Sequence, residues 1–341
     1  MAKPRTDRKP GDLTVSSCSY GFGYIRKSWL ALIAETEGAG KGEDPGHVHR
    51  MRVASRRLRA AMPIFKSCFP PEKYRKWRKE IKNITASLGE ARDLDVQIAF
   101  LEEYLGEMAG ETGKGRPPGF PETGPEDVSA LLHLLQQKRD QVQPAVGAVG
   151  SALRKGGVLD GFGAVLASSS EGEFGTGKRK ALHLVAQKTI SSRIADLLSY
   201  EPFVHDAGAV TRHHEMRIAA KRLRYTLETF SGFYSDALRP SLRQVRALQD
   251  VLGQVHDCDV WIGYLPMVLQ GLHTRDPDHT GELCMPVDRH PGISGLLEDR
   301  KRERARLYRE FVEMWEGLRN GGFFEALEEL AAHPPPGSDR Q

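Results

Sequence analysis

The sequence has few of the features that mark disulfide-rich, membrane-spanning or exported proteins. Its 341 residues include four cysteines, which lie far apart and form no C-x-x-C pair: Cys18, Cys68, Cys258 and Cys284. This pattern indicates neither a zinc site nor a disulfide framework, so we expect reduced thiols in a cytoplasmic protein. The apolar run from Trp29 to Ala34 is too short for a signal peptide. No stretch approaches the roughly 18 apolar residues that a membrane span needs.

Catalytic motifs are also missing. The sequence contains no Gly-rich phosphate loop, nucleophile elbow or H-E-x-x-H string. His47 and His49 would point to different sides of a helix, and so would the adjacent His213 and His214. His49 and His214 could meet across the molecule, but the arginines around them disfavour a divalent cation. We therefore expect no metal, no cofactor and no enzyme.

An internal repeat is the strongest feature that the sequence does contain. Residues 49–59 match residues 214–224 at a shift of 165, and residues 88–96 match residues 252–260 at a shift of 164. Two blocks in the same order and at nearly the same shift indicate a duplicated unit. We predict two halves, with these bounds: 16–160 and 175–332.

Apolar positions in both halves follow a helical period, and no alternating strand pattern appears. The expected helices are, in chain order, 22–36, 45–67, 72–89, 93–106, 126–154, 179–200, 211–231, 237–253, 257–271, 293–319 and 322–332. In each half the third and fourth segments are either separate or one helix that bends at the Leu-Gly block. Asp44 and Pro45 are a good helix start, and Pro70 and Pro71 end one helix and open the next.

The segments between these helices are rich in glycine and proline, which is typical of loops. The expected loops are 37–43, 106–125, 156–178 and 272–292. Helices joined in this way pack as antiparallel bundles. The sequence therefore predicts an all-α fold of two antiparallel four-helix bundles.

A basic stripe follows one helix face in each half. At about 100° per residue, His49, Arg52, Arg56 and Arg59 share a narrow face opposite the apolar positions, with Arg57 on its flank. The second copy presents a matching stripe, namely His214, Arg217, Lys221 and Arg224, with Arg222 in the place of Arg57. On the next helix Arg75, Lys79 and Lys82 match a second basic triplet, Arg239, Arg243 and Arg246.

Such stripes point to a phosphate polyanion. Lysine plus arginine total 49 against 45 acidic residues, so the net charge of +4 alone does not indicate a polyanion, but the placement does. Like charges at this spacing destabilise a helix by a few tenths of a kcal/mol per pair, and a bound anion offsets that cost. Guanidinium groups bind phosphate with two parallel hydrogen bonds. We predict these polyphosphate-binding residues: His49, Arg52, Arg56, Arg57, Arg59, Lys79, Lys82, His214, Arg217, Lys221, Arg222, Arg224, Arg243 and Arg246.

Both repeated blocks resemble motifs of the CHAD family, the conserved histidine α-helical domain. The first is H-x-x-R-x-x-x-[RK]-R-L-R at His49 and His214, and the second is L-G-x-x-[RH]-D-x-D at Leu88 and Leu252. The resemblance covers residues 16 to 332. It implies two pseudo-twofold-related halves, basic helix faces that line a central channel or groove, binding of inorganic polyphosphate and recruitment to polyphosphate granules. The E-x-E-x-K strand of the CYTH domain, a frequent fusion partner, is missing, so we expect a stand-alone CHAD protein.

Two other function classes stay open at this point. A metal-dependent polyphosphate or triphosphate hydrolase would need a carboxylate cluster. The candidates are Asp93, Asp95, Asp257 and Asp259, for which capping or pairing with arginines is the favoured interpretation.

An RNA-binding protein would need aromatic platforms among the basic groups. Trp77 and Trp261 could stack on bases, but we favour a core role for both. The nearly pure Arg, Lys and His stripes favour a bare phosphate chain over nucleic acid. The expected partners are therefore inorganic polyphosphate and granule-associated proteins, with neither nucleic acid nor membrane among them.

Overall fold

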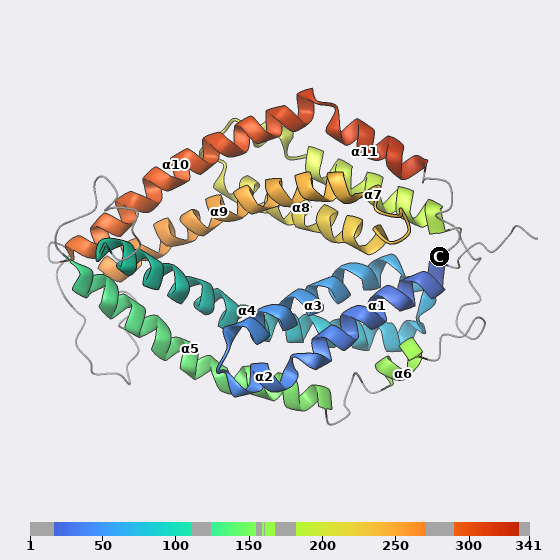
Figure 1. The fold of residues 1–341 in the computed structure, drawn as a ribbon, viewed down its shortest axis with the longest axis horizontal. Coiled ribbons are helices and arrows are strands. Elements are labelled where there is room, and N and C mark those ends of the chain that lie inside the picture. Colours follow the sequence, from blue (N-terminus) through green and yellow to red (C-terminus); the bar gives the residue numbers. More distant parts are fainter. Residues whose placement is uncertain are drawn as a thin grey trace, which may run out of the picture.

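All elements of the computed structural model are helices, within the residues that it describes: 17–110, 124–154, 159, 161–167, 182–270 and 290–333 (Figure 1). The first half contains α1 (Ser17–Ala34), α2 (Thr36–Lys41), α3 (Pro45–Ile64), α4 (Pro71–Met108), α5 (Pro125–Arg154) and α6 (Phe162–Ala167). The second half contains α7 (Leu182–Leu198), α8 (Val210–Phe230), α9 (Arg239–Leu269), α10 (Pro291–Asn320) and α11 (Phe323–Ala332). The predicted all-α fold class is confirmed.

The helix starts follow the local sequence. The Asp44 carboxylate accepts a hydrogen bond from the backbone N–H of Gly46 at 2.7 Å, and Pro45 opens α3. Pro71 opens α4, as predicted. Both α4 and α9 run without interruption through their Leu-Gly blocks, so the third and fourth expected segments of each half form one helix.

Two of the expected loops contain short helices, and this part of the loop prediction is wrong. α2 occupies most of 37–43, and α6 lies within 156–178. Tertiary packing rather than local propensity explains α6. The ring of Phe162 lies edge-on to Trp29 and Trp77, at centroid distances of 5.1 and 5.0 Å.

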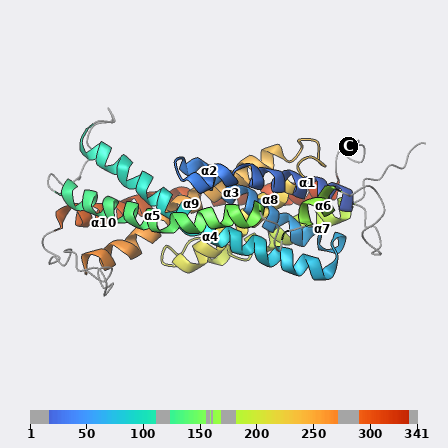
Figure 2. The same cartoon turned by 90° about the horizontal axis from the view of Figure 1, so that it is seen from below.

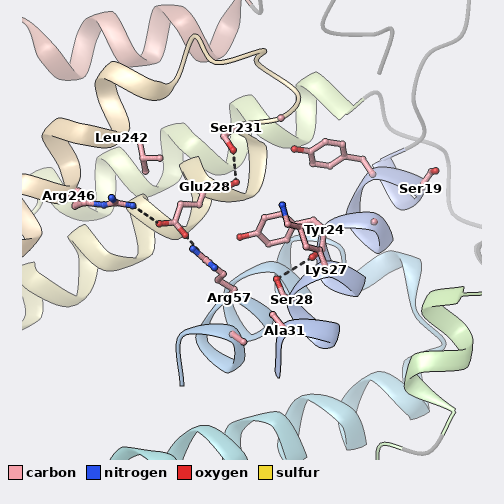
Figure 3. A pocket seen from close by; sticks show the side chains of 14 residues that line it. Ser19, Tyr24, Lys27, Ser28, Ala31, Arg57, Glu228, Ser231, Leu242 and Arg246 are labelled. Atoms are coloured by element: carbon pink, nitrogen blue, oxygen red, sulfur yellow. Dashed lines mark hydrogen bonds and ion pairs between the residues drawn. The ribbon is translucent and has the colours of Figure 1, made fainter. Parts of the chain in front are cut away.

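The two halves join at two places along an elongated molecule (Figures 1 and 2). At one place α3 packs against α8, and the rings of Phe65 and Phe230 lie 6.1 Å apart within a core that both halves share. A cavity lies beside this contact, between α1, α3, α8 and α9 (Figure 3). At the other place α5 packs against α10, and a second core forms around Leu101, Leu131 and Trp261. The core role expected for Trp77 and Trp261 is confirmed.

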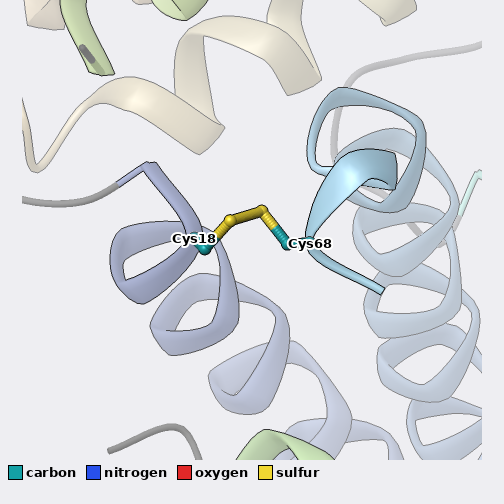
Figure 4. The surroundings of a disulfide bond; sticks show 2 residues. All are labelled: Cys18 and Cys68. Atoms are coloured by element: carbon teal, nitrogen blue, oxygen red, sulfur yellow. A yellow bond between two sulfur atoms is a disulfide. The ribbon is translucent and has the colours of Figure 1, made fainter. Parts of the chain in front are cut away.

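Cys18 and Cys68 form a disulfide, which corrects the expectation of reduced thiols (Figure 4). Their Cα atoms lie 5.4 Å apart because α1 packs along α3 and places its first turn beside the short helix Lys66–Cys68. A separation of 50 residues in the sequence carries no sign of this contact. Cys258 is a buried free thiol, and Cys284 lies outside the described residues.

None of the helices in the described part of the chain is long and apolar enough to cross a membrane.

Candidate functional site

The basic stripes of the two halves come together where α3 packs against α8. Arg56 on α3 lies close enough to Arg217 and Lys221 on α8 for its charge to lower the pKa of both side chains. The charge of Arg52 also lowers the pKa of Lys221. Arg92 from α4 and His256 from α9 extend the group on either side. We call this set the shared basic cluster: His49, Arg52, Arg56, Arg92, His214, Arg217, Lys221 and His256.

Helical periodicity fixes the direction of these side chains. Met51, Ala54 and Leu58 of α3 are buried, and so are their counterparts on α8, which are Met216, Ala219 and Leu223. Because these apolar positions face the core, the residues on the opposite face of each helix carry the basic groups toward the other half. The predicted stripes on α3 and α8 are therefore real helix faces.

Carboxylates from both halves lie near the basic side chains. Arg52 donates a hydrogen bond from Nη2 to Asp93 Oδ1 at 3.1 Å. Asp257 lies near Arg217 and Lys221, and burial raises its pKa while these two neighbours lower it. Asp93 and Asp257 thus lie near four arginines and one lysine, and Glu215 and Asp259 act on His214; the five basic groups are Arg52, Arg56, Arg92, Arg217 and Lys221.

Burial, and after it the neighbouring positive charges, lower the pKa of several bases in the cluster. Burial, followed by the charges of Arg217, Arg56 and Arg52, lowers the pKa of Lys221 to about 7. Burial and the same kind of neighbours lower the pKa of His256 to about 3 and depress those of His49 and His214. These histidines are therefore neutral donors at neutral pH. His214 and His256 also contact each other, with their Nδ1 atoms 3.1 Å apart.

Arg52 and Arg217, which occupy equivalent positions of the repeat, share one further property. The Nε atom of each is buried and has no hydrogen-bond partner among the residues that the structure describes. A buried donor without a partner costs about 1–3 kcal/mol. This cost therefore falls at the same position of the repeat in both halves.

One ion pair in each half links a helix that carries part of the cluster to its neighbour. Arg139 of α5 donates to Asp95 of α4 at 2.6 Å, and Arg304 of α10 donates to Asp259 of α9. The favoured interpretation of Asp95 and Asp259 as partners of arginines is confirmed. The arginines themselves were missed. Their positions differ by 165, which is the shift of the repeat, so the sequence did contain a signal for them.

The remaining predicted residues divide into two groups. Lys79, Lys82, Arg222 and Arg243 are exposed, and so is Arg59, which lies near Arg56 and near Arg78, a basic residue that the prediction missed. Three others gather around the carboxylate of Glu228, away from the cluster, namely Arg57, Arg224 and Arg246. The Glu228 group was not predicted.

The two other histidines that the sequence analysis considered, His47 and His213, have partners within the fold. His47 contacts Glu35 at 2.8 Å, and the buried His213 lies 3.0 Å from the backbone carbonyl of Phe203. In the described part of the chain, no group of three His, Cys, Asp or Glu side chains is placed to hold a metal ion.

In the described part of the chain the regular elements are helices, and basic side chains from α3, α4, α8 and α9 lie close together. A family model described as the CHAD domain matches residues 23–266, more than half of the chain. The chain therefore belongs to the CHAD domain family, as its motifs predicted.

Two solved structures have the same fold. The chain is similar to the CHAD domain from the plant Ricinus communis, with 21% identity and a TM-score of 0.54 over 97% of this chain and 96% of that chain. It is also similar to PptA from Streptomyces chartreusis, with 16% identity and a TM-score of 0.55 over 88% of this chain and 99% of that chain. At these identities the likeness shows the fold alone. No curated protein matches the chain.

Proposed function

We propose that the shared basic cluster binds inorganic polyphosphate and that the protein is a non-enzymatic binding protein, which this ligand brings to polyphosphate granules. One observation carries the proposal. Arg52 and Arg56 of the first half act electrostatically on Lys221 of the second half, and the buried Nε atoms of Arg52 and Arg217 have no hydrogen-bond partner among the described residues. Membership of the CHAD domain family supports it.

The length of the stripes favours a linear ligand. Ten residues separate His49 from Arg59, which corresponds to about 15 Å along α3. A single phosphate ion would reach only part of such a row. A chain of phosphates can contact the row on α3 and the row on α8 together, and each contact is a charge-assisted hydrogen bond.

Competition between long-chain polyphosphate and RNA tests the choice of ligand. At equal phosphate concentration we expect polyphosphate to displace RNA, because the cluster offers basic groups without aromatic platforms. Its affinity should fall steeply with salt as counterions are released, by analogy with nucleic-acid binding. Preferential binding of RNA would overturn the proposed ligand.

Assays for hydrolysis test the non-enzymatic part. We expect no orthophosphate release from polyphosphate or tripolyphosphate by the pure protein with Mg²⁺ or Mn²⁺. Release that depends on Asp93 or Asp257, two carboxylates near the arginines of the cluster, would instead favour a metal-dependent hydrolase.

A further inference from the structure

The cavity beside the contact of α3 with α8 has its own chemistry (Figure 3). Its volume is about 700 Å³, within the range of about 300–1,000 Å³ that is typical of small-molecule sites. α1 supplies most of one wall, and the other walls come from α3, α8 and α9. The members of the shared basic cluster do not line it.

The charged groups of this cavity are mostly basic. Lys27, Arg57 and Arg246 line it together with a single carboxylate, that of Glu228. Arg57 donates from Nε to Glu228 at 3.2 Å, and Arg246 Nη2 lies 3.7 Å from the same carboxylate. The Glu228 side chain is 10% exposed, whereas those of Arg57 and Arg246 are 42% and 56% exposed. Glu228 therefore positions the two guanidinium groups and leaves part of each available.

Lys27 adds a third positive charge from the opposite wall. The structure shows no ion pair for it among the described residues. Among the lining residues, three cations against one carboxylate give an excess of two positive charges, and Arg224 lies behind the same carboxylate at 3.5 Å. A phosphate monoester carries about −1.5 to −2 charges at neutral pH, which matches this excess.

The rest of the lining suits a planar or apolar body. Tyr24 of α1 contributes a ring, and Leu242 contributes an apolar side chain from α9, whereas the ring of Tyr20 packs against phenylalanines of the core. Burial raises the pKa of Tyr24 to about 12, so its hydroxyl stays neutral near pH 7. A Cβ atom added at Gly23 would meet nothing within 4 Å, so there is open space on the α1 wall.

The repeat does not reproduce this arrangement. Glu228 corresponds to Pro63 at the shift of 165, so the first half has no carboxylate at the position that holds Arg57 and Arg246. The cavity is thus a feature of one side of the contact between the halves. Its chemistry does not depend on the proposed polyphosphate function.

We infer that this cavity is a second anion site, which binds a small phosphate monoester with a planar body of about the size of a nucleotide. Lys27, Arg57 and Arg246 contact the phosphate, and Tyr24 contacts the planar body by stacking.

Isothermal titration of the full chain with AMP as the probe tests this inference. We expect one AMP per chain, and binding of adenosine and of inorganic phosphate weaker by on the order of tenfold or more, because each retains only one part of the recognition. Lys27→Ala should weaken AMP and leave adenosine unchanged. Gly23→Phe should abolish AMP binding by filling the cavity, whereas Gly23→Ala, its matched control, should keep it.

Arg56→Ala separates this site from the shared basic cluster. It should leave AMP binding unchanged while it weakens long-chain polyphosphate. No AMP binding at millimolar concentration would overturn the inference. AMP binding that survives Lys27→Ala and is lost in Arg56→Ala would overturn it too, since the nucleotide would then lie in the cluster. If circular dichroism shows that Gly23→Phe loses helix content, Lys27→Ala decides the outcome.

Discussion

The two halves place equivalent basic residues in different surroundings. In the first half Arg52 donates to the exposed Asp93, and Arg59 at the end of the stripe is exposed. In the second half Lys221 is sufficiently buried among arginines that its pKa falls to about 7, and Arg224 lies 3.5 Å from Glu228. The second stripe is therefore the more enclosed one, and the first is the more accessible one.

The difference shows which parts of the duplicated unit carry structure and which carry charge. In both ion pairs, Arg139–Asp95 and Arg304–Asp259, the arginine Nε meets the aspartate Oδ1. The side chains are 12% and 7% exposed in the first pair and 15% and 12% exposed in the second. The residues around the stripes differ, since His256 replaces Arg92 and Glu228 replaces Pro63. These two ion pairs, which we call the frame, are kept in both copies, whereas the charged residues around the two stripes differ.

Breaking the frame should have the largest effect. Asp95→Ala and Asp259→Ala each leave a buried arginine without its partner, and the acidic side chains are only 7% and 12% exposed. We expect each substitution to lower the free energy of unfolding by about 3–5 kcal/mol. Urea denaturation followed by circular dichroism measures the loss. The exposed Asp140→Ala on α5 is the control, and equal stability of Asp95→Ala and this control would refute the role of the pair.

The sequence predicted the frame only in part, and for a physical reason. The repeat identified Asp95 and Asp259 because they lie within a matched block. Arg139 and Arg304 lie on helices without such a block, so their shared shift of 165 is the only sequence signal for them, and the packing of α5 on α4 and of α10 on α9 brings them to the aspartates. The stripes on α3 and α8 were predictable because periodicity alone fixes a helix face.

Features outside the repeat could not be predicted from the sequence. The ion pairs of Glu228 with Arg57 and Arg246 depend on how α3, α8 and α9 pack together. The position of the first half that matches Glu228 holds Pro63. The Cys18–Cys68 contact likewise depends on tertiary packing. Both were missed because no local pattern encodes a contact between distant segments.

The disulfide offers a second way to separate the halves. Positions 183 and 233, which match Cys18 and Cys68 at the shift of 165, hold His183 and Phe233, so the second half has no such link there. Cys18→Ser with Cys68→Ser should lower the free energy of unfolding by about 2–4 kcal/mol, through loss of the crosslink that closes the loop. Urea denaturation with and without dithiothreitol measures it. The reductant should destabilise the wild type and leave the double variant unchanged; an equal response in both would contradict the prediction.

Removal of the accessible stripe tests whether the halves act together. Arg52→Ala with Arg56→Ala and Arg59→Ala should weaken long-chain polyphosphate by about 100-fold, because contacts of one chain with both halves multiply through effective concentration. Titration measures the affinity, and circular dichroism confirms that helix content is kept. The matched control removes three exposed charges on α10: Lys301→Ala, Arg302→Ala and Arg309→Ala.

A different result would show that the halves bind separately. If the triple variant keeps half of the binding capacity at unchanged affinity, the second stripe binds polyphosphate alone and the cluster is not shared. If the α10 control loses as much affinity as the stripe variant, net charge rather than the cluster determines binding.

The enclosed stripe should give polyphosphate binding its pH dependence. In the free protein the Lys221 pKa of about 7 leaves this side chain increasingly neutral above pH 7. A bound polyanion favours the charged form and raises that pKa, so binding takes up a proton in this window.

Titration of Lys221 should therefore leave the affinity constant below pH 7. Above pH 7 the affinity should fall, by up to about tenfold per pH unit, until the pKa of the bound state is reached. Lys221→Arg should flatten this slope between pH 7 and 9, where the histidines of the cluster are neutral in the free protein, whereas Lys82→Arg, at an exposed position of α4, should keep it. Titrations at fixed ionic strength measure the slope, and a slope that survives Lys221→Arg would assign the pH dependence to another group and remove the functional distinction between the two stripes.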